Sequence, residues 1–375
     1  MLKRKIAIIG ASYLQQPLVE KAQAMGLETH CFAWEEGAVC KEIADFFYPI
    51  SILEKELILE KCIQIKINGI TSIASDAAVP TVCYVAENLG LISNLYVDSF
   101  AMTNKYEMRK RFHLHKVSSP KFAATTEIND FEDFQYPLIV KPTDRSGSRG
   151  VEKVKSAYSL ENAIERAKKE SFSNQVIVEE FIDGVEVSVE TISWNGEHYI
   201  LTITDKVTTG EPYFVELEHH QPSMLNYGVI LDIRKETIKA LNALNIKFGA
   251  SHAEFKISSN GDVYIIEVGA RMGGDFIGSD LVKLSTGYDF VQGIVEVALG
   301  KFEPPTFIDN SYSGIYFLCK ETEHLQDYFH NATLYKEIVS SEIFNENLLL
   351  VQNSADRSGY LIYQSNKKWD INKKR

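Results

Sequence analysis

Two glutamates lie on neighbouring predicted strands, and the second of them, Glu267, interrupts an otherwise apolar run. Glu254 lies within 251–256 and Glu267 within 264–268, and an Asn-Gly step at 260–261 separates the two stretches. This step is a strong signal for a β-hairpin, in which the two carboxylates can point from adjacent strands to one face. A buried carboxylate needs a cation, and two carboxylates without an excess of histidine or cysteine suit Mg²⁺ that also binds phosphate. An ion pair from each glutamate to a nearby lysine or arginine is the alternative.

Groups that bind anions follow the second glutamate and also occur earlier in the chain. Arg271 offers a planar fork of N–H donors, and Gly273 and Gly274 leave their backbone N–H groups accessible. Lys141 ends the apolar run 138–141 and therefore directs a positive charge out of a sheet. These residues favour the phosphate interpretation of the two glutamates.

The loop 146–150 follows Lys141 and has the sequence Ser-Gly-Ser-Arg-Gly. Because glycine has no Cβ atom, backbone N–H groups of such a loop can approach phosphate oxygens. The loop is not a P-loop, since no Gly-Lys-Ser/Thr sequence opens a helix. A solvated turn after an edge strand is the alternative interpretation.

An acidic bend at 178–186 is a further candidate for nucleotide binding. The strand that ends near Glu179 and Glu180 could present backbone groups to the edge of an adenine, and the carboxylate of Glu186 could accept ribose hydroxyls. Acidic residues after a strand usually lie at the surface, which is the alternative.

The elements that position these residues fall into two classes. The β-branched run 6–9, the turn Gly10-Ala11-Ser12 and a helical pattern through Met25 predict the strand, turn and helix of a parallel α/β unit. Strands at 29–33 and 69–74 complete a small doubly wound domain. The turn lacks a full G-x-G-x-x-G sequence, so a dinucleotide is not indicated.

After residue 104 the pattern becomes that of an α+β fold with antiparallel strands. A join at Pro304-Pro305 precedes further short strands within 313–364. The predicted strands are 120–126, 137–141, 150–154, 175–181, 186–193, 198–205, 250–257 and 262–268, and the predicted helices are 159–170 and 231–244.

Composition limits the compartment and the partners of the protein. The 375 residues carry a net charge of −12, which disfavours nucleic acid, and no run approaches the roughly 18 apolar residues of a membrane span. The five cysteines lack metal-binding or disulfide spacing, as in a reducing compartment. The apolar run 6–9 is too short for a signal peptide. We therefore expect a cytoplasmic protein with no nucleic-acid or membrane partner.

Taken in the order in which they occur along the chain, these motifs resemble those of the ATP-grasp superfamily. This superfamily includes D-alanine–D-alanine ligase, biotin carboxylase, carbamoyl phosphate synthetase and the L-amino acid ligases. The similarity is strong over about residues 100–300. It implies a fold of the α/β and α+β classes, in which an N-terminal Rossmann-like pre-ATP-grasp domain precedes a two-lobed ATP-grasp fold and a small C-terminal α+β region. The implied boundaries are 1–100, 101–185 (small lobe), 186–302 (catalytic lobe) and 303–375.

The resemblance also implies roles for individual residues. Lys105 and Lys141 hold phosphates, the loop 146–150 closes over them, and Glu254 and Glu267 bind one or two Mg²⁺ or Mn²⁺ ions. Arg271, with Lys141, is the catalytic residue that stabilises the transferring phosphoryl group. The implied ATP-binding set is Lys105, Lys141, Ser146, Gly147, Ser148, Gly150, Glu179, Glu180, Ile182, Glu186 and Lys206.

For the substrates, the resemblance is to the segment with which L-amino acid ligases hold an amino group. Glu216 takes the ammonium group in this interpretation and His219 orients nearby, whereas a charged strand end with a core histidine is the alternative. The implied substrate-binding set is Glu216, His219, Arg271, Gly273 and Gly274. Gly269 departs from the family, which often has an asparagine there as a third oxygen ligand of the metal.

The implied activity is that of an ATP-dependent carboxylate–amine ligase, which forms an amide through an acyl phosphate. Its partners are a small carboxylate and an amine, and a homodimer is left open. Two alternatives remain: a carboxylase or carbamoyl phosphate synthetase-like enzyme that activates bicarbonate, and a nucleotide-binding protein without turnover.

Overall fold

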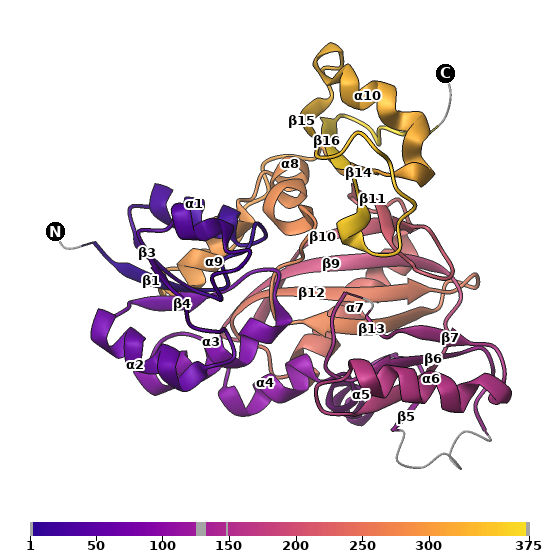
Figure 1. The fold of residues 1–375 in the computed structure, drawn as a ribbon, viewed down its shortest axis with the longest axis horizontal. Helices are drawn as coiled ribbons and strands as arrows, with labels where there is room; N and C mark the ends of the chain where they lie inside the picture. The colour runs from indigo at the N-terminus through magenta and orange to yellow at the C-terminus, as the bar shows by residue number, and fades with distance from the viewer. Residues whose placement is uncertain (1–2, 125–132, 148, 373–375) are drawn as a thin grey trace.

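The structure is a computed structural model, which describes residues 3–124, 133–147 and 149–372. Ser148, part of the predicted phosphate loop, lies outside the described residues. The strands of the described chain form one parallel sheet of four strands, one antiparallel sheet of four and one antiparallel sheet of eight. Figure 1 shows the eight-stranded sheet in the centre, between the N-terminal domain and the lobe that contains the small antiparallel sheet.

The N-terminal domain is the doubly wound unit that the sequence predicts. Its sheet has the order β3-β2-β1-β4, and all neighbouring strands are parallel. The predicted strand at 69–74 is shorter than expected, because β4 ends at Thr71 and an irregular segment continues to Asp76. The elements are β1 (Lys5–Ile9), α1 (Gln16–Ala24), β2 (Glu28–Phe32), β3 (Phe46–Tyr48), α2 (Lys55–Ile65), β4 (Gly69–Thr71) and α3 (Val79–Leu89).

The small lobe is an antiparallel sheet of order β5-β8-β6-β7. Helix α6 covers it with an apolar stripe of i, i+3, i+4 spacing, which includes Leu160, Ala163 and Ile164. Two helices, α4 and α5, lead into this lobe from the N-terminal domain. The elements are α4 (Tyr96–Thr103), α5 (Lys105–Leu114), β5 (Phe122–Ala124), β6 (Leu138–Pro142), β7 (Glu152–Val154), α6 (Ala157–Glu170) and β8 (Val176–Glu180).

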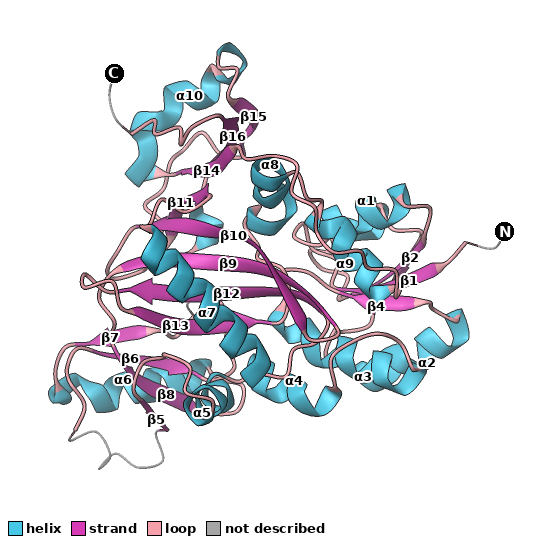
Figure 2. Ribbon diagram, turned by 180° about the vertical axis from the view of Figure 1, so that it is seen from behind, coloured by secondary structure: helices cyan, strands magenta, loops and turns pink. Residues whose placement is uncertain are grey.

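The large sheet has the order β13-β12-β9-β10-β11-β14-β16-β15. Helix α7 lies across β9, β10, β12 and β13 (Figure 2), and its apolar side packs on alternate strand residues such as Val187, Val189 and Phe255. The predicted hairpin at 250–268 is present as β12 and β13. The strands and helix are β9 (Val185–Trp194), β10 (Glu197–Thr208), β11 (Glu216–Gln221), α7 (Tyr227–Ala243), β12 (Gly249–Ile257) and β13 (Val263–Gly269).

The C-terminal strands continue this large sheet, because β14 pairs with β11 and β16 pairs with β14. The segment with Glu216 and His219 forms strand β11 with a buried histidine, as in the alternative interpretation of a charged strand end. The remaining elements are α8 (Val282–Thr286), α9 (Phe290–Ala298), β14 (Tyr312–Leu318), α10 (Gln326–His330), β15 (Ile338–Ile343) and β16 (Gly359–Ser365).

Helix α9 joins the N-terminal domain to the large sheet. Its buried residues Ile294 and Val295 share one apolar core with Ile6 of β1 and Ile192 of β9. This shared core fixes the end of β4 beside the large sheet. Among the described residues, no helix has the length and apolar character needed to cross a membrane.

Candidate active site

One face of the large sheet is polar, because side chains alternate along each strand. Glu186, Ser188 and Glu190 of β9 point to this face, and the valines between them point to the core under α7. In the register of the sheet, Glu254 pairs with both Ser188 and Glu267. The sequence-based expectation that Glu254 and Glu267 are cross-strand neighbours is therefore confirmed.

Lys206 is surrounded by carboxylates at one end of the polar face. Its ammonium nitrogen lies 2.9 Å from Glu186, 2.9 Å from Glu254 and 3.5 Å from Glu216, and its side chain is 3% exposed. Burial opposes the charge, but the three carboxylates outweigh it and raise the pKa of Lys206 well above its ordinary value. This lysine cluster, formed by Lys206 and the three glutamates, carries a formal charge of −2.

His252 links the lysine cluster to the glycine pair after β13. Its Nδ1 atom hydrogen-bonds to the buried carboxylate of Glu190, and its Nε2 atom lies 3.3 Å from Glu254. Glu190 also accepts a hydrogen bond of 3.0 Å from the backbone N–H of Gly273. Burial lowers the pKa of His252, but Glu190 and Glu254 together raise it to about 9, so the imidazole is a cation at pH 7.

Lys141 lies in the opposite kind of environment. Its Nζ atom is 2.6 Å from Glu179, and Nε of Arg109 is 2.6 Å from the other oxygen of the same carboxylate. Burial would raise the pKa of Glu179, but Arg109 and Lys141 hold it below its ordinary value, so the carboxylate is charged. This arginine–lysine cluster of Arg109, Lys141 and Glu179 carries a formal charge of +1.

Lys105 connects the small lobe to the metal-ligand candidates. Its Nζ atom lies 2.7 Å from Glu267 and donates a 2.7 Å hydrogen bond to the carbonyl oxygen of Arg145. Asn104 caps the helix that Lys105 begins, which fixes the position of the lysine. Glu267 and Glu254 thus each contact a lysine, which is the alternative interpretation of these carboxylates.

The remaining predicted ATP contacts lie around the hinge between the lobes. Glu180 accepts a hydrogen bond of 3.2 Å from the backbone N–H of Gln135, and Ile182 follows the end of β8. Glu186 also contacts Lys256 at 3.1 Å. Gly184 has a positive φ of 148°, and a Cβ atom there would lie 1.9 Å from the carbonyl oxygen of Ile257, so only glycine fits this crossing.

The predicted phosphate loop begins four residues after the end of β6 at Pro142. Ser146 is exposed, and Gly147 and Gly150 adopt left-handed backbone conformations with φ of 67° and 72°. At Gly150 a Cβ atom would lie 2.9 Å from the side chains of Pro142 and Glu170. The backbone of the loop therefore favours glycine at these two positions, and the predicted contact with phosphate stays a prediction.

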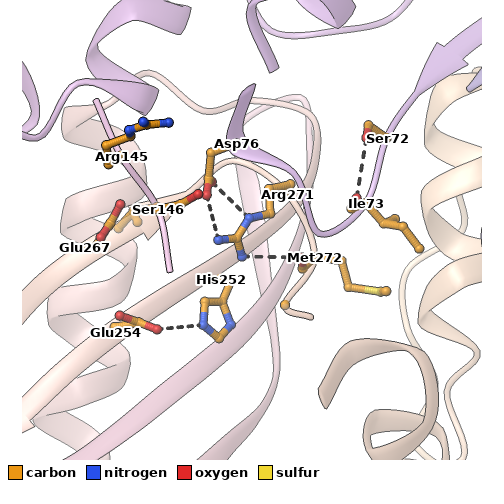
Figure 3. A network of polar contacts seen from close by, with 12 residues as sticks. Ser72, Ile73, Asp76, Arg145, Ser146, His252, Glu254, Glu267, Arg271 and Met272 are labelled. Carbon is orange, nitrogen blue, oxygen red and sulfur yellow. Dashed lines mark hydrogen bonds and ion pairs between the residues drawn. The ribbon is translucent and has the colours of Figure 1, made fainter. Parts of the chain in front are cut away.

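Arg271 is held by Asp76 of the N-terminal domain. The two carboxylate oxygens of Asp76 accept hydrogen bonds from Nε and Nη2 of Arg271, each 2.9 Å long (Figure 3). Gly273 follows closely, and a Cβ atom there would lie 2.7 Å from His252 and 2.8 Å from Glu190. Gly274 packs near Ala74 of the N-terminal domain.

The predicted amine contacts meet an arginine from the C-terminal segment. Nη2 of Arg357 lies 3.2 Å from Glu216, and its Nη1 atom lies 2.8 Å from Asp275. His219 pairs with Lys206 in the register of β10 and β11 and is 1% exposed. Neither of its ring nitrogens has a hydrogen-bond partner among the described residues. Burial and the nearby cations lower the pKa of His219 well below its ordinary value, so its ring is neutral.

Residues of the site that the sequence analysis did not assign to it include Asp76, Arg109, Glu190, His252 and Arg357. Glu190 lies four residues after Glu186 on the predicted strand 186–193, so the alternation of that strand could have placed both on one face. Asp76 follows a predicted parallel strand, where polar side chains often gather. Arg109 and Arg357 carry no local signal, because only the tertiary fold brings them to the site.

The residues present fit a bound divalent cation. Glu254 and Glu267 offer hard oxygen ligands from paired positions, and phosphate oxygens and water would supply the other ligands. Within the described ranges, no group of three or more histidine, cysteine, aspartate or glutamate side chains could hold a metal ion. Gly269 has no side-chain oxygen, so among the described residues Glu254 and Glu267 are the two candidate ligands that the sequence predicts.

The family model of the ATP-grasp domain matches residues 134–280. The chain contains an ATP-grasp domain. The match covers the polar face of the large sheet from β9 to β13 and the strands β6 to β8 of the small lobe.

Similar proteins include ligases. The chain is 26% identical over 295 residues to an alanine–anticapsin ligase of Bacillus subtilis. The aligned segment covers 68% of this chain and 62% of that protein. The chain is also 28% identical over 282 residues to a D-alanine–D-alanine ligase of Flavobacterium johnsoniae, and this alignment covers 70% of this chain and 84% of that protein. The chain thus spans less than two thirds of the first of these relatives.

Solved structures with the same fold cover nearly the whole of this chain. An L-amino acid ligase from Bacillus licheniformis has a TM-score of 0.81 at 23% identity and covers 98% of this chain and 95% of its own. A phosphoribosylglycinamide synthetase from Anaerococcus prevotii has a TM-score of 0.77 at 19% identity, with the same coverage. These similarities establish the fold, with its N-terminal domain, beyond the residues that the family model matches.

Proposed function

We propose that this ATP-grasp protein is a carboxylate–amine ligase, which uses ATP to form an amide through an acyl phosphate. The observation that carries the proposal is the pairing of Glu254 with Glu267 on the polar face, between the cations Lys105, Lys206 and Arg271. This arrangement suits the transfer of a phosphoryl group, whose developing charge needs fixed cations and metal-bound oxygens. The similar proteins named above support the ligase interpretation.

The first step is the attack of a carboxylate oxygen on the γ-phosphorus of ATP. The new O–P bond forms as the bond from that phosphorus to the β,γ-bridging oxygen breaks, and ADP leaves. Lys141 and Lys105 hold the phosphates, and Arg271 binds the transferring group. A bound Mg²⁺ or Mn²⁺ ion would lie at Glu254 and Glu267 and would supply neutralisation of phosphate charge.

The second step is the attack of an amine on the carbonyl carbon of the acyl phosphate. The C–N bond forms, the bond from carbon to the phosphate oxygen breaks, and phosphate leaves with one oxygen of the original carboxylate. The amine must lose protons as it attacks. Glu216 would bind the ammonium form, and His219 would orient nearby on the same strand.

The loop 146–150 would close over the phosphates and exclude water, which otherwise hydrolyses an acyl phosphate. Its glycines allow such movement, and Lys105 already contacts the loop region through the carbonyl oxygen of Arg145. We also propose that the enzyme works in the cytoplasm, since all five cysteines are buried free thiols.

The experiment that tests the function is ADP release with a panel of amino acids, first one at a time and then in pairs. A ligase should release ADP only with a suitable acid and amine, and should transfer ¹⁸O from the labelled carboxylate to inorganic phosphate. Hydroxylamine in place of the amine should trap the acyl group as a hydroxamate. Binding of ATP without ADP release for any acid and amine would overturn the proposal and favour a non-catalytic nucleotide-binding protein.

A bicarbonate-activating enzyme is the second candidate. It is favoured by a biotin carboxylase domain from Hydrogenobacter thermophilus, solved with MgADP and bicarbonate, which shares this fold at a TM-score of 0.76 and 15% identity. Release of ADP that requires bicarbonate and no other acid would support this candidate instead of the amide ligase.

A further inference from the structure

Asp76 brings a carboxylate of the N-terminal domain to the reactive end of the polar face. It forms a bidentate contact with Arg271, with both distances at 2.9 Å, and each side chain is 17% exposed. Burial opposes both charges, yet the pair keeps the pKa of Asp76 below its ordinary value. A bidentate contact fixes the plane of a guanidinium group, whereas a single hydrogen bond fixes only one of its atoms.

The segment that carries Asp76 is itself held firmly. The side-chain amide of Gln15 donates to the carbonyl oxygen of Ile73 at 2.8 Å, and the hydroxyl of Ser72 donates to the carbonyl oxygen of Ile9 at 2.6 Å. The backbone N–H of Ala74 donates to the carbonyl oxygen of Met272, at 3.2 Å, which ties this segment to the one after Arg271. Figure 3 shows the carboxylate of Asp76, which belongs to the N-terminal domain, directed at the guanidinium group of Arg271.

Gly269 leaves the space that this contact occupies. A Cβ atom at position 269 would lie 2.7 Å from Oδ1 of Asp76 and 2.9 Å from Cζ of Arg271, closer than real Cβ atoms approach other atoms. The backbone of Gly269 is outside the left-handed region, so conformation does not require glycine here. A side chain at this position would instead force the carboxylate of Asp76 or the guanidinium group of Arg271 to shift, which would disturb their contact.

We propose that Asp76 is a positioning residue for Arg271 and that Gly269 is coupled to it, because the glycine provides the room for their contact. The proposal rests on the proposed function, in which Arg271 binds the transferring phosphoryl group. A free arginine has several rotatable bonds and would have to be ordered during the reaction, whereas Asp76 orders it beforehand. Asp76 itself acts only through Arg271.

The first test does not depend on turnover. In protein labelled with ¹⁵N-arginine, the Nε–H signal of Arg271 is assigned by comparison with Arg271→Lys, and its hydrogen exchange is measured. Exchange should be slow in the wild-type protein and fast in Asp76→Ala and Gly269→Ala. Lys21→Ala is the matched control, because the 2.7 Å contact of Lys21 with Asp289 joins the N-terminal domain to α9 away from Arg271. Slow exchange in Asp76→Ala would overturn the proposal.

The second test uses ADP release with the acid and amine found for the wild-type protein. Asp76→Ala should lower kcat by about 10- to 100-fold, as loss of a residue that orients a catalytic group often does, with the KM for ATP nearly unchanged. Gly269→Ala should also lower kcat. The double variant should be no slower than Asp76→Ala, because without the carboxylate the guanidinium group can move away from the new methyl group.

Two results of the second test would overturn the proposal. One is a fold-loss of kcat in the double variant equal to the product of the losses in the two single variants. The other is a loss of kcat in Lys21→Ala equal to that in Asp76→Ala. Melting temperatures identify variants that fail to fold, and Asp76→Asn, which keeps the shape but removes the charge, then replaces Asp76→Ala. If no acid and amine support turnover in the wild-type protein, the proposed function fails, while the hydrogen exchange of Arg271 still decides the positioning role.

Discussion

The two lysine-containing clusters of the polar site have opposite charge. In the arginine–lysine cluster, Arg109 and Lys141 share the single carboxylate of Glu179. In the lysine cluster, Lys206 alone faces three glutamates. Both lysines are buried, with side chains 6% and 3% exposed, so burial does not distinguish them.

The difference in charge indicates which ligand each cluster can hold. The excess positive charge at Lys141 suits phosphate oxygens, and the excess negative charge at Lys206 suits a divalent cation or an ammonium group. Lys206 was predicted to contact ATP. Its three carboxylate partners repel phosphate, so Lys206 can contact a phosphate group only when a further cation neutralises these carboxylates. The two clusters thus divide the site into a phosphate end and a cation end.

The largest effect is expected from Glu267→Ala, which removes one of the two paired metal-ligand candidates. ADP release should fall about 10³-fold, because charge stabilisation in the transition state depends on this oxygen ligand. Stability should fall less than in a variant that leaves two buried cations unpaired, since Glu267 is partly exposed and Lys105 keeps its hydrogen bond to the carbonyl oxygen of Arg145. Asp232→Asn, on the exposed side of α7, is the control and should keep full activity. Normal activity of Glu267→Ala would contradict the metal assignment.

At the phosphate end, Glu179→Gln should mainly reduce stability. The change leaves Arg109 and Lys141 buried without a counter-charge, which typically destabilises a protein by about 3–5 kcal/mol. Urea denaturation measures this loss. The matched variant Glu180→Gln changes a neighbouring carboxylate that accepts a hydrogen bond from the backbone N–H of Gln135, and it should lower the free energy of unfolding by much less. Equal losses would show that Glu179 is not the counter-charge that the fold requires.

The comparison is sharpened by replacing each lysine with methionine and adding Mg²⁺. Lys206→Met leaves three carboxylates together, so Mg²⁺ should bind there without ATP and raise the melting temperature. A ligand at ten times its Kd stabilises by about 1.4 kcal/mol. Lys141→Met leaves Glu179 paired with Arg109 and should not respond to Mg²⁺. The same Mg²⁺ response in both variants would contradict the division of the site.

Much of the fold could be predicted because its signals are local. The run 6–9 with its glycine turn predicted β1, and the Asn-Gly step predicted the β12–β13 hairpin with Glu254 opposite Glu267. The helix expected at 231–244 begins earlier, at Tyr227, where Asn226 caps it. Signals of this kind depend on residues near each other in the sequence.

The partners of the site residues could not be predicted in the same way. Arg109 reaches Glu179 across 70 residues, and Asp76 reaches Arg271 across 195. No spacing or periodicity encodes such contacts, since they follow from how α5 and the N-terminal domain pack on the sheets. The predicted roles of the individual residues in ATP, metal and substrate binding likewise stay predictions, which the variants described here test.

The smallest expected effect is a pH dependence of stability that comes from His219, beside the cation end. The pKa of His219 is well below its ordinary value of about 6.5 in the folded protein, so the unfolded chain binds the proton more readily. The contribution of His219 to the free energy of unfolding is therefore complete above about pH 6.5. It is lost as the pH falls below this value, by at most about 1.4 kcal/mol per pH unit. His219→Gln should flatten the fall in the free energy of unfolding between about pH 6.5 and 5, measured by urea denaturation at each pH. An unchanged slope would mean that His219 is charged in the folded protein, and that the carboxylates of the cation end stabilise this charge.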